Sequence, residues 1–450
     1  MRDPVLFLII VVWIPIIFWR PWTGILAWYW VGLMAPHGLC WGFMRTFPIA
    51  MAVGVPALIS LFLAKDRRPV PFTREIVMTI VFLLDITMTS IFAVYPEGAW
   101  DQWQKIMKIV LVSLITPMLI YGEKRVLALI FVVTFSVGYY GFKGGIFAIT
   151  TGGSNMVLGP PGSYLQGNTF IGLAMIMVLP LLFISARLVY HRWVDFSGTW
   201  FDKWTRPIGL MLYGGFWLTV IAILVTYSRG ALLGLLAIAP FLFLKMRYKW
   251  LMIVMAFIVF GVVGVAAPDR LVARWKTIET YEEDQSAMQR IQAWGANFNM
   301  ALARPLTGMG MSNASLGYDW WRQYVNFDGT WQHVLSAHSL YFQILGQHGF
   351  LGLGIYLTMI GFTFFTLNKI RRTALQTTGK IWLKEYAWAI QLSLLGFLTA
   401  GAFIDVAYFT LVYALIALAI IMKKELDSSS APVTPAPRAP AKVSPKNRLD

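Results

Sequence analysis

Residues 169–189 read TFIGLAMIMVLPLLFISARLV and hold a single charged side chain, that of Arg187. A helix needs about 20 apolar residues to cross the hydrocarbon core of a bilayer, so this stretch is long enough to span a membrane. Because similar runs recur along the chain, we predict an all-α, polytopic transmembrane helical protein with about 12 spans. The other candidate runs, of which the first two are short enough to form one broken element, are 6–19, 22–35, 47–64, 76–94, 106–121, 126–141, 207–228, 230–244, 250–267, 340–365, 386–404 and 406–422.

The composition agrees with a chain that lipid covers. Of the 450 residues, 58% are hydrophobic and 13% are charged, whereas about a quarter of the residues in a soluble domain are charged. These values exclude an ordinary cytosolic enzyme, and they exclude disorder for most of the chain, because disordered segments are poor in hydrophobic residues. Cys40 is the only cysteine, which excludes an intrachain disulfide and a cysteine-based metal cluster.

The 37 Lys and Arg residues outnumber the 21 Asp and Glu residues, for a net charge of +16. Cytoplasmic loops of membrane proteins retain Lys and Arg, and the basic clusters here fall in alternate loops. Most of the positive charge is therefore expected to set the membrane topology, with a cytoplasmic C-terminus, and no nucleic acid partner is expected. The loops expected outside are 36–46, 95–105, a flexible Gly/Ser/Pro-rich loop at 142–168, and 268–338.

The chain divides into four expected parts. Residues 1–267 and 339–424 form transmembrane helices, 268–338 form an external loop domain, and 425–450 form a disordered cytoplasmic tail. The external insertion is unusually long for a bare connection, and such loops are usually functional. We expect a helix near 285–303 in it, followed by aromatic side chains that either stack on sugars or join the interfacial belt of Trp and Tyr. These aromatic residues are Tyr318, Trp320, Trp321, Tyr324, Phe327 and Trp331.

Arg229 stands in TYSRGALLG, where two apolar runs meet at the expected outer face. An arginine at a membrane boundary is either an anchor that extends to the interface or a functional group. Function is favoured because Ser228 and Gly230 leave space around the guanidinium and no acidic residue is near in the sequence. A guanidinium presents a rigid fork of donors that suits phosphate oxygens.

Arg290 lies in the external insertion, in QSAMQRIQAWGANF. It is either a solvated helix residue, paired with Glu283 or Asp284, or a residue that holds an anion together with the backbone amides of a helix start. The arginines of the same insertion that compete for this role are Arg270, Arg274, Arg304 and Arg322.

His338 stands in LSAHSLYFQILGQHGFLG, where the insertion enters the next membrane run. A lone histidine is either structural or, when neutral, a base that accepts a proton. His333 and His348 are its rivals for the second role. The spacing of the three histidines puts them on different helical faces and no carboxylate cluster joins them, so no metal site is expected.

Asp85 and Asp405 lie inside apolar runs, where carboxylates often belong to proton pathways. Without partner bases they form a weak relay. The chain has neither a P-loop nor a Rossmann fingerprint, so we expect no cofactor and no direct use of ATP or NAD. The energy for any reaction must then come with the substrate.

The order of these motifs resembles the C-terminal signature of the O-antigen ligase and polymerase superfamily, over about residues 165–365. The matching motifs are TYSRGALLG, R-x-x-x-W from Arg290 to Trp294, ARPLTGMGMSN and AHSLYFQILGQHGFLGLG. The aromatic-rich first half is most similar to the O-glycosylation ligases associated with exosortase systems. The resemblance implies a GT-C-like, multi-pass protein of the bacterial inner membrane, with its active site facing the periplasm.

The resemblance also implies an activity and its residues. Members of the family are inverting, metal-independent glycosyltransferases that transfer a glycan from undecaprenyl diphosphate to a hydroxyl acceptor on a protein, lipid or polysaccharide. Arg229 and Arg290 match the family arginines that hold the diphosphate, and His338 matches the histidine proposed as general base. Ser339 departs from the Asn that commonly follows this histidine, which leaves the expected acceptor positioning less defined than diphosphate binding.

Two alternative functions stay open at this point. A polymerase of the same superfamily would extend a lipid-linked glycan instead of transferring it to another acceptor. A lipid-linked oligosaccharide flippase or transporter belongs to a different class, which typically shows internal repeats with broken helices. The sequence shows no such repeat.

Overall fold

The computed structural model describes residues 2–194, 201–246, 248–250, 253, 254, 257, 261, 285–325 and 333–430. In this part of the chain the regular structure is helical, with one isolated bridge between Gly159 and Gly167, so the all-α prediction is confirmed there. The candidate span 250–267, residues 268–284 of the insertion and the tail from 431 lie largely or wholly outside the described residues.

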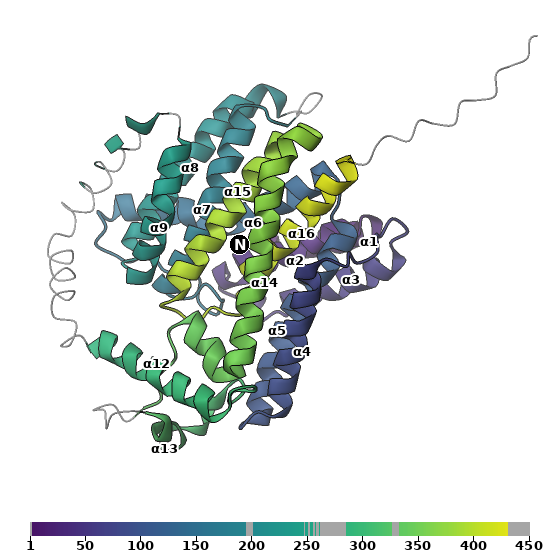
Figure 1. The fold of residues 1–450 in the computed structure, drawn as a ribbon. Helices are drawn as coiled ribbons and strands as arrows, with labels where there is room; N and C mark the ends of the chain where they lie inside the picture. The colour runs from purple at the N-terminus through teal and green to yellow at the C-terminus, as the bar shows by residue number, and fades with distance from the viewer. Residues whose placement is uncertain are drawn as a thin grey trace, which may run out of the picture.

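Two groups of helices make up the structure in Figure 1. The first group comprises α1 (Arg2–Trp19), α2 (Trp22–Met34), α3 (Ile49–Leu63), α4 (Arg74–Ile91), α5 (Pro96–Leu119), α6 (Glu123–Thr150), α7 (Asn168–Tyr190), α8 (Thr205–Val225) and α9 (Arg229–Lys245). The second comprises α12 (Gln285–Ala303), α13 (Tyr318–Trp321), α14 (Leu340–Thr378), α15 (Ile381–Gly401) and α16 (Thr410–Ser430). Thus α1 and α2 are separate helices, and α16 continues into the segment expected to form the tail.

Several helices suit a membrane by length and composition. Five described segments are long and apolar enough to cross one, which supports an integral membrane protein but does not confirm about 12 spans. The helix α3 is apolar but shorter. The five segments are Arg2–Trp19, Glu123–Thr150, Asn168–Tyr190, Asp202–Val225 and Leu340–Gln376.

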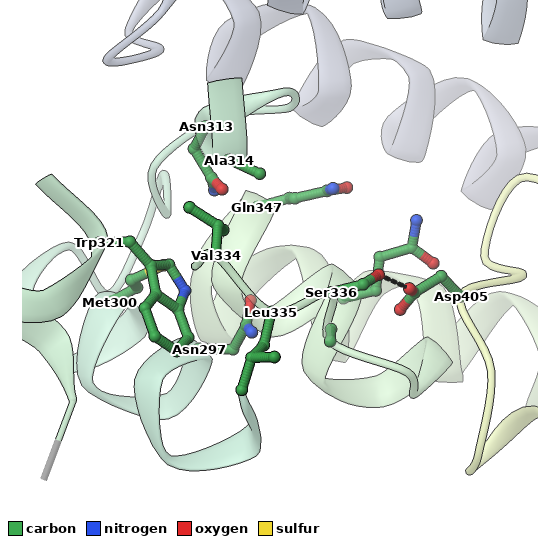
Figure 2. A pocket seen from close by; sticks show the side chains of 12 residues that line it. Asn297, Met300, Asn313, Ala314, Trp321, Val334, Leu335, Ser336, Gln347 and Asp405 are labelled. Carbon is green, nitrogen blue, oxygen red and sulfur yellow. Dashed lines mark hydrogen bonds between the residues drawn. The ribbon is translucent and has the colours of Figure 1, made fainter. Parts of the chain in front are cut away.

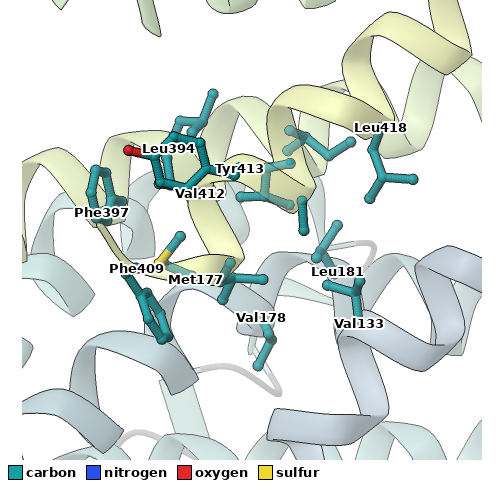
Figure 3. Packing of buried hydrophobic residues seen from close by; sticks show 14 of the residues in the cluster. Val133, Met177, Val178, Leu181, Leu394, Phe397, Phe409, Val412, Tyr413 and Leu418 are labelled. Atoms are coloured by element: carbon teal, nitrogen blue, oxygen red, sulfur yellow. The ribbon is translucent and has the colours of Figure 1, made fainter. Parts of the chain in front are cut away.

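The stretch that first indicated a membrane protein forms the centre of the bundle. Within α7, 89% of the most apolar window is buried by other helices, so most of this stretch contacts protein instead of lipid. A helix that is hydrophobic on all sides suits such a position. In Figure 3, Met177, Val178 and Leu181 of α7 pack with Val133 of α6 and with side chains of α15 and α16.

The flexible loop expected at 142–168 is partly wrong, because α6 continues to Thr150. The glycines that suggested a loop instead allow close packing of two helices. A Cβ atom at Gly141 would lie 2.3 Å from Thr219 Oγ1, and one at Gly145 would lie 2.3 Å from the Leu218 carbonyl oxygen of α8. Gly therefore serves here to bring two backbones together, as small residues do between membrane helices.

The external insertion folds against one end of the bundle. The helix expected near 285–303 is confirmed as α12, which lies across that end beside the start of α14 (Figure 1). Ala293, Ala296 and Met300 of α12 form a small core with Trp321 of α13. At least one of the predicted aromatic side chains, Trp321, therefore serves packing, since only 1% of its surface is exposed.

Candidate functional site

A pocket of about 250 Å³ collects residues from α9, α12 and the connection after α15. Arg229 of α9 and Arg290 of α12 both line it, with Trp294 and Phe403 among the other lining residues. Both arginines are partly exposed. The two guanidiniums chosen from sequence therefore belong to one cavity, although they are far apart along the chain.

The sequence around Arg229 explains its position. The Ser228 hydroxyl caps α9 by accepting a hydrogen bond from the Ala231 amide at 3.2 Å, so Arg229 is the first residue of the helix. A Cβ atom at Gly230 would lie 3.2 Å from the Cβ atom of Phe403. The serine thus starts the helix and the glycine lets the connection after α15 approach. The helix dipole adds positive potential where the Arg229 backbone lies.

Arg290 and Trp294 face the pocket together because residues four apart lie on one side of a helix. The Trp294 ring stacks on Phe342 of α14, with centroids 5.3 Å apart and planes 10° apart. Its buried indole Nε1 atom has no hydrogen-bond partner within the described residues. Because α12 as described begins at Gln285, Arg290 lies in its second turn, past the amides of the helix start.

The competing arginines have other surroundings. Arg304 donates a hydrogen bond to the Phe92 carbonyl at 2.8 Å, which ties the end of α12 to the end of α4. Arg322 forms an exposed ion pair with Asp319 at 3.6 Å. Neither of them lines the pocket of Arg229 and Arg290. The remaining rivals, Arg270 and Arg274, lie outside the described residues.

His338 lies in the turn that precedes α14. Its side chain is exposed, and its backbone φ of 45° is left-handed, which is uncommon for a residue other than Gly. Asp405 fixes this turn from both sides: it accepts hydrogen bonds from the Ser336 hydroxyl and from the Ser339 amide, the latter at 3.2 Å. Asp405 itself lies in the connection 402–409, so its predicted place inside an apolar run is wrong.

A second, polar pocket of about 220 Å³ lies beside this turn. Asn297 of α12, Gln343 and Gln347 of α14, and Asp405 supply polar groups, and Ala337 also lines it. Figure 2 shows Asn297 and Trp321 on one side of this cavity and the bonded pair of Ser336 and Asp405 on another.

The two pockets share their structural supports. Arg290 and Trp294 of α12 line the first pocket, and Asn297, one turn later, lines the second. Phe403 lines the first and Asp405 the second, so the same two segments border both. Sequence reasoning missed the amide side chains because single Asn and Gln residues carry no recognisable spacing.

His348, the rival of His338, is fully buried and holds helices together. Its Nδ1 atom lies 2.6 Å from the Thr89 hydroxyl and its Nε2 atom 2.5 Å from the Tyr408 hydroxyl. The Asp85 carboxylate lies 3.9 Å from Nδ1, so the expectation that Asp85 has no partner base is wrong. Because both ring nitrogens are occupied, His348 is poorly placed to act as a base at the surface. His333 is exposed.

The described residues contain no group of three or more His, Cys, Asp or Glu side chains arranged to hold a metal ion. The positive charge available in the arginine pocket therefore comes from the two guanidiniums within the described part of the chain.

Comparison with known families agrees with this region of the structure. Residues 214–357 match the O-antigen ligase family, Wzy_C, and this match includes Arg229, Arg290 and His338. Residues 1–190 match a family of unknown function, DUF5935. No curated protein matches the chain. The first match supports the O-antigen ligase superfamily and a membrane ligase-like or polymerase-like function.

Proposed function

We propose that this protein is an inverting, GT-C-like membrane glycosyltransferase of the exosortase-associated O-glycosylation ligase type. It transfers a glycan from undecaprenyl diphosphate to a hydroxyl acceptor at the periplasmic face of the bacterial inner membrane, without a metal ion. The observation that carries the proposal is the common pocket of Arg229 and Arg290, within the part of the chain that matches the O-antigen ligase family.

The arginine pocket suits the leaving group. When the bond between the anomeric carbon and the diphosphate oxygen breaks, its electron pair stays on the diphosphate and increases its negative charge. Guanidiniums placed at that charge stabilise the transition state more than the ground state. Arg229 and Arg290 supply this charge, and the unpartnered Trp294 Nε1 group adds a neutral donor on the same wall.

The base belongs at the turn between the pockets. As the acceptor oxygen bonds to the anomeric carbon from the face opposite the diphosphate, its proton passes to a neutral His338 imidazole. Attack from the opposite face inverts the configuration at the anomeric carbon. The polar pocket beside the turn, lined by Asn297, Gln343 and Asp405, offers acceptors and donors for sugar hydroxyls.

Transfer by purified protein tests the proposal, with a labelled polyprenyl-diphosphate-linked glycan as donor and membranes as the source of acceptor. His338→Ala is expected to lower the rate about 100-fold to 10,000-fold, the usual range for a general base. Arg290→Ala is expected to lower kcat/KM for the donor about 10-fold to 150-fold, because it removes a hydrogen bond between two charged groups.

The chain offers a matched control for each variant. His333→Ala removes an exposed histidine from the same segment, and Arg322→Ala removes an exposed arginine from the same insertion. Both controls are expected to keep normal transfer. Full transfer by His338→Ala or Arg290→Ala at normal membrane levels would contradict the assignment.

Two measurements separate the alternative functions. If the protein is a polymerase, its deletion leaves glycans of single repeat units, whereas deletion of a ligase leaves long glycans on the lipid carrier. If it is a flippase, purified protein moves the donor across a bilayer but does not cleave it.

A further inference from the structure

Two further pockets join into one cavity among α2, α3 and α5, within the part of the chain that matches a family of unknown function. One has a volume of about 220 Å³ and the other about 630 Å³. Trp28, Ala50 and Lys108 line both, so the two are continuous. None of the arginine pocket residues lines either of them.

The smaller pocket is an apolar groove that opens toward the bilayer. It is lined by Met51 and Val55 of α3 and by Leu111 and Ile115 of α5. Met51, Val55 and Leu111 are 61%, 48% and 37% exposed in the protein alone. A groove with exposed apolar walls inside a membrane is covered by a lipid chain.

The larger pocket carries positive charge at the expected outer end of the same groove. Lys105 and Lys108 lie three residues apart and hence on one face of α5, where the predicted span 106–121 begins. Within the described residues neither ammonium group has an ion-pair or hydrogen-bond partner. Asp101, one turn before Lys105, forms no ion pair with it there. An uncompensated charge at this depth favours an anionic partner.

Polar groups surround the two lysines. Gln102 comes from α5, Ser163 and Tyr164 come from the loop before α7, and Thr410 begins α16. The cavity therefore presents ammonium, hydroxyl and amide groups above an apolar groove. This order matches a lipid with an anionic, hydroxyl-bearing head group.

We propose that this cavity binds an anionic phospholipid of the phosphatidylglycerol class, with the phosphate at Lys105 and Lys108 and one acyl chain in the groove. The lateral opening admits lipids of the surrounding bilayer, which are present in large excess. The two lysines select against a zwitterionic phosphatidylethanolamine head, whose own ammonium they repel. The site is independent of the proposed glycosyl transfer.

Native mass spectrometry of the full chain with phosphatidylglycerol and phosphatidylethanolamine of equal chain length tests the proposal. Phosphatidylglycerol is expected to bind more tightly. Its affinity is expected to fall about fivefold in Lys105→Gln or Lys108→Gln and about 30-fold in the double variant. Lys143→Gln removes another exposed lysine that lines neither pocket, and it is expected to leave the affinity unchanged.

A second variant tests the groove without changing any charge. Leu111→Trp fills the apolar pocket from a partly exposed position, and it is expected to weaken phosphatidylglycerol binding while both lysines remain. The proposal fails if the two phospholipids bind equally, or if the double lysine variant keeps the preference. It also fails if undecaprenyl phosphate occupies the site and equal amounts of phosphatidylglycerol do not displace it.

Discussion

Removal of the Asp405 carboxylate should release the turn that carries His338. In the structure this carboxylate accepts hydrogen bonds from Ser336 and Ser339, on either side of His338 in sequence. The left-handed backbone of His338 is strained by about 1–3 kcal/mol, and the surrounding bonds must offset that strain. Asp405 is therefore predicted to be a positioning residue that acts through His338.

The size of the effect follows from the two bonds. A hydrogen bond to a charged group contributes about 1.5–3 kcal/mol, and about 1 kcal/mol each is reasonable for a carboxylate that is only half-buried. Loss of both, about 2 kcal/mol, corresponds to a fall in kcat of about 30-fold for Asp405→Ala. Asp405→Asn keeps an acceptor for the Ser339 amide, so its fall in kcat should be smaller.

The assay is steady-state transfer from the labelled lipid-linked donor. The KM for the donor should not change in Asp405→Ala, because Asp405 does not line the arginine pocket. In a His338→Ala background the same substitution should have almost no further effect, since the base that it positions is already absent. A normal kcat for Asp405→Ala, or a full additional loss in that background, would refute the reasoning.

Two further predictions concern stability, each measured as thermal unfolding in detergent. Gly145→Ala is expected to destabilise by about 1–3 kcal/mol, because the added Cβ atom meets the Leu218 backbone, whereas Gly138→Ala, with no neighbour within 4 Å at its new Cβ atom, should not; equal unfolding temperatures would contradict the packing argument. Hydrogen bonds, chiefly from the Tyr121 hydroxyl, hold the pKa of Asp66 below its usual value of 3.8, so its stabilising contribution is present above that pH and is lost as the pH falls through the lower, folded-state pKa. The stability advantage over Asp66→Asn should therefore shrink on acidification, and an advantage that grows would show the sign to be wrong.

Helical periodicity and apolar length allowed much of the fold to be predicted. The run at 169–189 corresponds to α7, and the insertion helix expected near 285–303 corresponds to α12. The end of α6 could not be predicted, because glycines that break a helix in water are tolerated where two helices approach closely. Sequence shows that a glycine is present but not what backbone lies opposite it.

The residues of the candidate site divide in the same way. Arg229, Arg290 and His338 could be selected from sequence because a charged or titratable side chain at the edge of an apolar run is conspicuous. The roles of Asp405 and His348 could not, since Asp405 acts on a turn that precedes it by many residues and His348 resembles His338 in its local sequence.

The sequence by itself determined a helical membrane protein and named two arginines and a histidine as candidates for its chemistry. Only the tertiary structure decided that the two arginines line one pocket, that Asp405 holds the turn of His338, and that His348 is buried between helices. The physical reason is that apolar length and helical spacing are local properties of the chain. The convergence of side chains from α9, α12 and the connection after α15 depends on how those segments pack against each other.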